Sequence, residues 1–199
     1  MNRADVAELH YITPIANVPS IVQHGILSHN RARHLSHHSV AMQEVQDIRE
    51  NKRIPGARPL HDYANLYFDA HNPMLSKRRE HNDELCVLHV SPDVLDLPSV
   101  IVTDRNAARG AVRFYDVEAG LAALDRDRLY AVFWLHPESV IEQDRHATLK
   151  CAEVLVPDRV TPDFICGAYV ANEVGLATLQ ALGLSLPATI KSAMFFWPR

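Results

Sequence analysis

KCAEVLV, residues 150–156, is the stretch of this 199-residue chain that indicates its fold most clearly. A short run that is apolar on both faces is typical of a strand buried inside a sheet, so we expect a strand here. One carboxylate, Glu153, stands in the middle of the run, where an unpaired charge would be costly. Such an acid is either held by a cation or kept for a reaction, and the stretch alone leaves both interpretations open.

Short strands are also predicted before and after this stretch. They cover residues 9–13, 66–68, 85–90, 100–103, 165–170 and 194–197. Helices are predicted at about 18–24, 42–49, 118–124, 130–135 and 173–182. Asn17 is expected to cap the first helix and Gly25 to end it. Because the strands are short and do not alternate regularly with helices, the sequence predicts one α+β domain over residues 1–199.

The composition excludes several classes of protein. Lys and Arg number 20 and Asp and Glu 24, and this charge of −4 argues against a broadly basic coat for duplex DNA or anionic membranes. No apolar run approaches the ~18 residues that a membrane-spanning helix needs. The first residues lack the apolar core of a secretion signal. Three widely spaced cysteines, Cys86, Cys151 and Cys166, are predicted to be small buried hydrophobes, which favours a cytoplasmic protein.

Twelve histidines raise the question of a metal site, but their spacing does not support one. The sequence contains no H-E-x-x-H and no C-x-x-C motif, and His34, His37 and His38 stand in a polar stretch without an acidic neighbour. We therefore predict no metal ion.

Other polar features carry less information on their own. Arg49 ends a predicted helix just before a Pro/Gly loop, where an arginine is usually solvated. His61 and Asp62 are adjacent, so on one strand they would point to opposite faces and could not form a catalytic dyad. The basic clusters are Lys77-Arg78-Arg79 and the set Arg105, Arg109 and Arg113. Such clusters commonly only solvate a face, although with Phe114 and Tyr115 nearby the second set could follow a nucleic-acid strand.

Several motifs resemble the DarT family, the DNA ADP-ribosyltransferase toxins of toxin–antitoxin pairs. The matching stretches are His10-Tyr11-Ile12-Thr13 with Asn17, residues 45–49 (VQDIR), 60–68 (LHDYANLYF) with 72–75 (NPML), 102–105 (VTDR) and 150–153 (KCAE). They follow the family's order over nearly the whole chain, and the H-D-Y…Y-F…P-M-L block is the most specific of them.

The resemblance implies a compact ADP-ribosyltransferase-like fold, with short-stranded central β-sheets and peripheral helices, and NAD⁺ as the substrate. By position, Arg49 and Glu153 match the family's catalytic arginine and glutamate. The segment near 33–51 matches the part that folds over NAD⁺, and residues 103–153 match the substrate-facing loop. The residues that the resemblance assigns to NAD⁺ binding are His10, Tyr11, Ile12, Thr13, Ser20 and Arg49.

One departure from the family concerns the first strand. The family often has Tyr-His-Ile-Thr, whereas this chain has His10 one place earlier and Tyr11 after it. Strand alternation would then place Tyr11 at the nicotinamide, so both His10 and Tyr11 stay candidates for this contact.

The activity implied is transfer of ADP-ribose from NAD⁺ to a base, thymine or guanine, in single-stranded DNA, as a toxin that blocks replication. Arg105, Arg109 and Arg113 are the DNA-binding candidates, and a DarG-like macrodomain antitoxin is the implied partner. Two alternatives stay open. One is an ADP-ribosyltransferase or NAD⁺ hydrolase acting on protein or RNA, and the other is a non-catalytic nucleic-acid-binding module.

Overall fold

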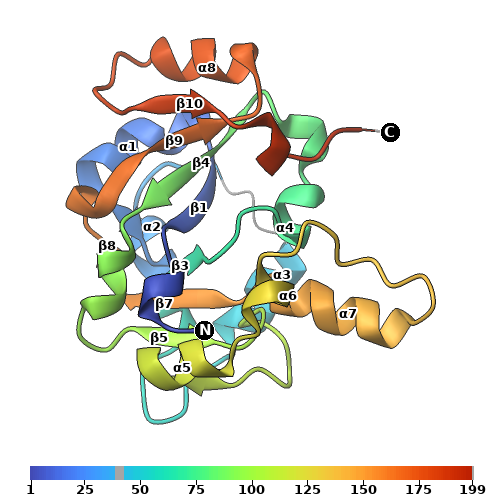
Figure 1. Cartoon of the computed structure of the whole chain (residues 1–199). Helices are drawn as coiled ribbons and strands as arrows, with labels where there is room; N and C mark the ends of the chain where they lie inside the picture. Colours follow the sequence, from blue (N-terminus) through green and yellow to red (C-terminus); the bar gives the residue numbers. More distant parts are fainter. Residues whose placement is uncertain (39–42, 199) are drawn as a thin grey trace.

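Two groups of strands meet at one residue pair in the middle of the central sheet. The computed structural model of the chain describes residues 1–38 and 43–198. Its eight-stranded sheet has the order β10-β9-β4-β1-β3-β7-β5-β6. Within the described residues, β1 and β3 are in register only at His10 and Tyr67. The sheet therefore consists of two half-sheets, β10-β9-β4-β1 and β3-β7-β5-β6, which fill the upper and lower parts of Figure 1.

The strands are β1 (Leu9–Pro14), β2 (Ile26–Leu27), β3 (Tyr63–Tyr67), β4 (Leu85–Val90), β5 (Ile101–Thr103), β6 (Phe114–Tyr115), β7 (Glu153–Pro157), β8 (Arg159–Val160), β9 (Ile165–Val170) and β10 (Ala188–Ile190). Neighbouring strands of the large sheet are antiparallel except β9 and β10, which are parallel. Strands β2 and β8 form a separate two-stranded sheet.

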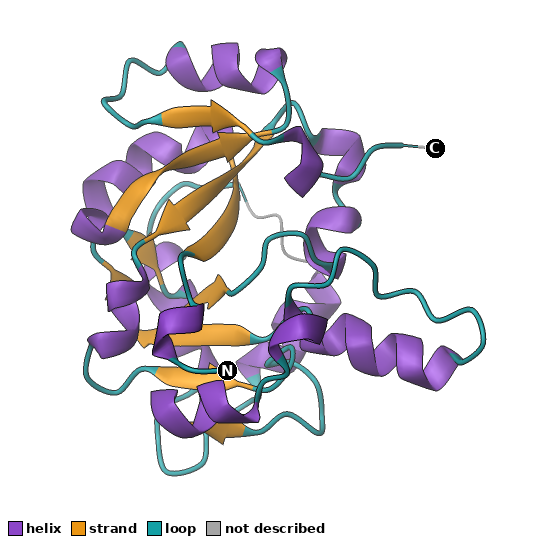
Figure 2. Ribbon diagram, in the orientation of Figure 1, coloured by secondary structure: helices purple, strands orange, loops and turns teal. Residues whose placement is uncertain are grey.

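The α-helices are α1 (Val18–His24), α2 (His29–Ala32), α3 (Gln43–Glu50), α4 (Pro73–Ser76), α5 (Val117–Ala123), α6 (Arg126–Leu129), α7 (Val140–Leu149) and α8 (Glu173–Gln180). The 3₁₀ helices are η1 (Arg3–Asp5), η2 (Ile15–Asn17), η3 (Leu60–Asp62), η4 (Arg79–His81), η5 (Pro92–Asp96), η6 (Pro162–Phe164) and η7 (Ser192–Met194). Helix α8 packs at the β10 edge of the sheet and α5 packs on β5 near the other edge (Figure 2). The predicted α+β class is confirmed. Within the described residues, no helix is both long and apolar enough to cross a membrane.

Side-chain alternation buries both faces of the first half-sheet. On β1, Leu9 and Tyr11 pack in the largest core cluster, together with Leu88 of β4. Ile12 points to the opposite face and packs with Val87 in a second cluster. Since consecutive residues of a strand point to opposite faces, this alternation fixes the register of β1 on β4.

Most short strands and helices lie where the sequence predicts them. Strands β4 and β9 have the expected bounds, β1 differs from its prediction by one residue, and α1 runs over 18–24 as expected. Gly25 ends α1 with φ of 87°, a value that glycine adopts without strain. Asn17, however, makes no side-chain cap to α1. Its amide instead donates to Thr13 Oγ1 and to the carbonyl of His38.

The strand predicted at 150–156 begins later than expected. Strand β7 starts at Glu153, so this carboxylate stands at the first residue of the strand and not in its middle. Lys150 instead caps the C-terminus of α7. Its side chain is fully buried, where Nζ forms an ion pair with Asp69 and donates to the carbonyl of Ala131 at 2.7 Å. The buried pair explains why the apolar run does not continue as strand through residue 150.

Three other predictions are wrong. Strand β3 starts at Tyr63 rather than at residue 66. Residues 130–135 are not a helix, because α6 ends at Leu129 and the Ala131 carbonyl is held by Lys150. The tail 194–197 forms no strand, since β10 already pairs with the edge of β9 and the Phe195 side chain is buried in the core.

We expect Lys150→Met to lower the free energy of unfolding by about 3–5 kcal/mol, because it leaves the Asp69 carboxylate without its buried counter-charge. Urea unfolding measures the loss. The control is Arg145→Met, which removes a mostly exposed ion-pair partner of Glu142 on the same helix and should change the stability little. Equal effects of the two substitutions would contradict the structural role given to Lys150.

Candidate active site

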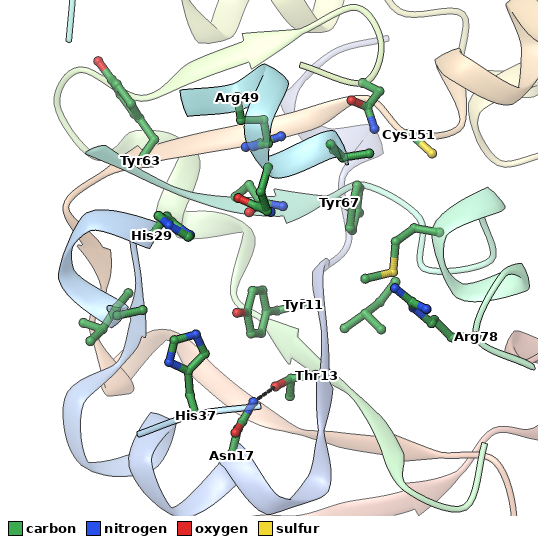
Figure 3. Close-up of a pocket in the computed structure, with 18 of the residues that line it drawn as sticks. Tyr11, Thr13, Asn17, His29, His37, Arg49, Tyr63, Tyr67, Arg78 and Cys151 are labelled. Carbon is green, nitrogen blue, oxygen red and sulfur yellow. Dashed lines mark hydrogen bonds between the residues drawn. The ribbon is translucent and has the colours of Figure 1, made fainter. Parts of the chain in front are cut away.

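A cavity of about 260 Å³ lies beside the junction of the two half-sheets. Its walls include residues 11–14 of β1, Tyr67 of β3 and Arg49 of α3. Figure 3 shows Tyr11 near the middle of this cavity, with Arg49 above it and Thr13 below. The cavity therefore forms where β1 and β3 are no longer paired.

Glu153 is fully buried beside this cavity and is held from three directions. Its Oε1 accepts the backbone N–H of Ala107 at 2.8 Å, and both carboxylate oxygens accept from Nη1 of Arg49, at 3.1 and 3.0 Å. Its own backbone N–H donates to Oγ1 of Thr103 at 2.9 Å. The charge is thus compensated by a cation and a peptide dipole, which a carboxylate without solvent contact requires.

Arg49 comes from α3 and is the buried residue of that helix. The expectation of a solvated arginine is therefore wrong for this position. Of the apolar side chains in the predicted helix 42–49, Val45 is half-buried and lines the cavity, Ile48 is 52% exposed, and Met42 lies outside the described residues. Only one of the three guanidinium nitrogens, Nη1, makes the two bonds to Glu153. Since Arg49 also lines the cavity, one group contacts both the carboxylate and the space where a ligand would bind.

The structure separates the residues predicted around β1. Tyr11, Ile12 and Thr13 line the cavity, and burial raises the pKa of Tyr11. His10 and Ser20 are not among its lining residues.

The buried His10 ring lies within hydrogen-bond distance of the Phe68 carbonyl, at 3.1 Å, and of Glu8, at 3.2 Å. The contact with His10 is the main cause that lowers the pKa of Glu8 to about 2. His10 thereby links β1 to the end of β3, next to the point where the half-sheets meet.

Two histidines in the cavity wall were not assigned by the sequence. His29 of α2 and His61 of η3 stack with ring centroids 4.2 Å apart. His61 and Asp62 lie in the 3₁₀ helix η3 and not on a strand, and Asp62 accepts a hydrogen bond from Asn30 at 2.7 Å. The LHDY motif pointed to His61, whereas nothing local in the sequence signals His29.

The three arginines proposed to bind DNA already have partners on the protein. Arg105 forms an ion pair with Asp104 at 3.0 Å, and Arg109 forms one with Asp144. A side-chain hydrogen bond with Tyr115 raises the pKa of Arg113. Their loop reaches the cavity through Asn106, so these residues lie near the site, but much of the charge of two of them is compensated.

The cysteines show one difference from expectation. Cys86 and Cys151 are buried, but Cys166 is exposed. Burial raises the pKa of Cys151, which lines the cavity, to about 12, so it remains a neutral thiol there. Over residues 1–38 and 43–198, no group of three or more histidine, cysteine or acidic side chains could hold a metal ion.

The chain is similar to several characterised proteins. The family described as "ssDNA thymidine ADP-ribosyltransferase, DarT" matches residues 10–196. A DNA ADP-ribosyl transferase of Thermus sp. (strain 2.9) is 30% identical over 161 residues, covering 74% of this chain and 73% of that protein. A DNA ADP-ribosyl transferase–DNA ADP-ribosyl glycohydrolase fusion protein of Thermosipho africanus is 29% identical over 207 residues. That match covers 96% of this chain but 50% of the fusion protein, so the chain spans about half its length.

Solved structures agree with this similarity. Thermosipho africanus DarTG in complex with ADP-ribose superposes with a TM-score of 0.79 and 27% identity, over 96% of this chain and 52% of that one. Thermus sp. 2.9 DarT in complex with ADP-ribosylated ssDNA gives a TM-score of 0.82 at 23% identity, over 98% and 99% of the two chains. The second likeness is one of fold.

We expect Thr103→Val to lower the free energy of unfolding by about 1–3 kcal/mol, because the buried N–H of Glu153 loses its acceptor while the side-chain volume is kept. Thermal or urea unfolding checks this value. Thr178→Val is the matched control: its hydroxyl donates to the Val174 carbonyl on an exposed helix face, so its effect should stay within about 0.5 kcal/mol. A Thr103 variant as stable as the control would show that the contact does not hold Glu153.

Proposed function

Because the chain belongs to the DarT family, we propose that it transfers ADP-ribose from NAD⁺ to a base in single-stranded DNA, with Arg49 and Glu153 as its catalytic residues. The observation that carries this proposal is the buried contact between the two residues at the cavity between the half-sheets. The family description names thymidine, so thymine is the base to test first and guanine second.

The residue types suit the chemistry of NAD⁺ cleavage. As the bond between nicotinamide and ribose breaks, nicotinamide leaves with the bonding electrons and positive charge develops on the ribose. A carboxylate fixed in a dry site stabilises that charge, and Glu153 is such a carboxylate. It can also orient the base whose nitrogen or oxygen attacks the ribose carbon. Tyr11, Ile12 and Thr13 are the proposed contacts for the nicotinamide side of NAD⁺.

Arg49 acts electrostatically in this proposal. A guanidinium with a pKa above ~12 does not accept a proton at neutral pH, so Arg49 is not a general base. Its fixed donors instead suit a diphosphate or a base that has lost its proton. His10 and Ser20, which do not line the cavity, are left with indirect roles toward NAD⁺.

The wider role follows from the relatives. The Thermosipho africanus fusion protein joins a DNA ADP-ribosyl transferase to a DNA ADP-ribosyl glycohydrolase. We propose that this chain acts in the cytoplasm, where NAD⁺ and DNA are both present, as a toxin that blocks replication. A DarG-like macrodomain that removes the modification would be its antitoxin.

One assay tests the function directly. The protein is incubated with NAD⁺ and single-stranded oligonucleotides of varied sequence, and the products are weighed by mass spectrometry. A gain of one ADP-ribose on DNA supports the proposal. Release of nicotinamide without modified DNA favours an NAD⁺ hydrolase or another acceptor, and absence of turnover favours a non-catalytic binding module.

Glu153→Gln should lower the rate of DNA modification by about 10²–10³-fold, since the amide keeps the shape of the side chain but carries no charge. The chain should remain folded, as judged by thermal unfolding. Retained activity in the folded variant would remove Glu153 from the mechanism.

Arg49→Ala should weaken NAD⁺ binding in calorimetric titration and abolish transfer. Arg53→Ala is the control, because Arg53 lies four residues later on the same segment and is exposed. A larger loss at Arg53 than at Arg49 would contradict the assignment.

Single-stranded oligonucleotides should be modified far faster than duplexes of the same sequence. The reactive atom of a paired base is hidden in the stack, and extruding the base costs a few kcal/mol. With a net charge of −4, the chain attracts phosphates only weakly, so the rate should fall gently as salt is added. The logarithm of the affinity for DNA, plotted against the logarithm of the salt concentration, should have a slope of roughly −0.7 per phosphate contact. Charge reversal at Arg105 and Arg113 should make this slope shallower, because fewer phosphates are contacted, and should leave NAD⁺ affinity unchanged. An unchanged slope would place the DNA on another surface.

A further inference from the structure

Helix α3, which carries Arg49, is held to the rest of the protein largely by polar contacts. Its buried residue is Arg49 itself. Of its apolar residues, Val45 is half-buried in the cavity wall and Ile48 is 52% exposed. A helix normally docks by burying an apolar stripe, so the orientation of α3 depends on the few hydrogen bonds that its inward side chains make.

One of these bonds comes from His61. Its Nε2 lies 3.1 Å from Oε1 of Gln46, and Gln46 precedes Arg49 by three residues on the same helix. Residues three apart share a helix face, so Gln46 and Arg49 both point inward, and both line the cavity. His61 thus holds α3 one turn before Arg49.

The His61 ring is itself rigidly placed. It is buried in the turn η3 and stacks on His29 of α2. Burial, together with the neighbouring His29 and Arg49, lowers the pKa of His61 to about 4, so the ring is neutral at physiological pH. A neutral imidazole has one N–H, and the amide oxygen of Gln46 needs a donor, so Nε2 carries the proton.

We propose that His61 is a positioning residue for the transfer reaction: by holding Gln46 it fixes α3, and with it the guanidinium of Arg49, at the cavity wall. This inference rests on the function proposed above. Among the described residues, His61 makes no hydrogen bond to Arg49 or Glu153, so its effect on Arg49 passes through Gln46 and the helix.

The first test measures the docking of α3 without using catalysis. Hydrogen exchange of the α3 amides is followed by mass spectrometry in wild type, His61→Ala and His61→Gln. The alanine variant should exchange about three- to tenfold faster in α3, which corresponds to the loss of one neutral hydrogen bond. The glutamine variant should stay close to wild type, because its amide places a donor near the position of Nε2. Wild-type exchange in His61→Ala would overturn the proposal.

The second test measures the reaction. His61→Ala should lower kcat for DNA modification about tenfold with little change in KM for the oligonucleotide, and His61→Gln should recover most of the loss. The matched control is His89→Ala, which removes a histidine that also stacks on an aromatic ring but lies in a different cluster, on Tyr169. It should lose comparable thermal stability and keep both kcat and α3 exchange unchanged. A kcat of His61→Ala equal to that of wild type would overturn the positioning role even if α3 loosens.

A double-mutant cycle tests whether His61 acts through Gln46. Gln46→Leu removes the acceptor, and the double variant with His61→Ala should exchange in α3 no faster than either single variant. Additive effects would mean that the two side chains act separately and would overturn the proposal. If no variant and not even wild type modifies DNA, the proposed function fails. The exchange data and NAD⁺ titrations of the same variants then still decide whether His61 positions Arg49.

Discussion

A buried carboxylate needs hydrogen-bond partners and a counter-charge from within the protein, and the site consists of the groups that supply them to Glu153. The counter-charge comes from Arg49 on α3, the peptide N–H comes from Ala107, and Thr103 holds the first N–H of the strand. These groups belong to segments far apart in sequence. The carboxylate is therefore satisfied only when both the second half-sheet and α3 are in place, and the site is a product of tertiary structure rather than of a local motif.

A buried ion pair such as Arg49–Glu153 contributes little to the stability of a protein. Removing two charges from water can cost more than their attraction returns, and apolar replacements are often neutral or stabilising. A charged pair at a cavity wall therefore agrees with the catalytic role proposed for Arg49 and Glu153. The docking of α3 fits this view. A helix held by few apolar contacts is released at a lower free-energy cost than the apolar core, so the position of α3 depends on its individual polar contacts.

The sequence predicted those features whose causes are local. Strands β4 and β9 are short apolar runs, and Glu153 stood out as a single charge in such a run. The features that were missed depend on distant partners. Lys150 lies outside the strand because it forms an ion pair with Asp69, 81 residues away, and no local sequence pattern around either residue predicts this pair. His29 belongs to the cavity wall only because the fold stacks it on another ring, so composition and periodicity could not reveal it.

The single pairing of His10 with Tyr67 has a consequence for the evolution of the cavity. In an antiparallel strand every second residue turns its N–H and C=O to the same neighbour. Beyond His10, within the described part of the chain, those groups of β1 have no partner on β3, and the residues that carry them line the cavity. Main-chain groups persist whatever side chain they carry. The β1 side of the cavity can therefore keep its polar edge while its side chains change, whereas Arg49 in the opposite wall, and the buried Glu153 that it contacts, act through side chains that have no such tolerance.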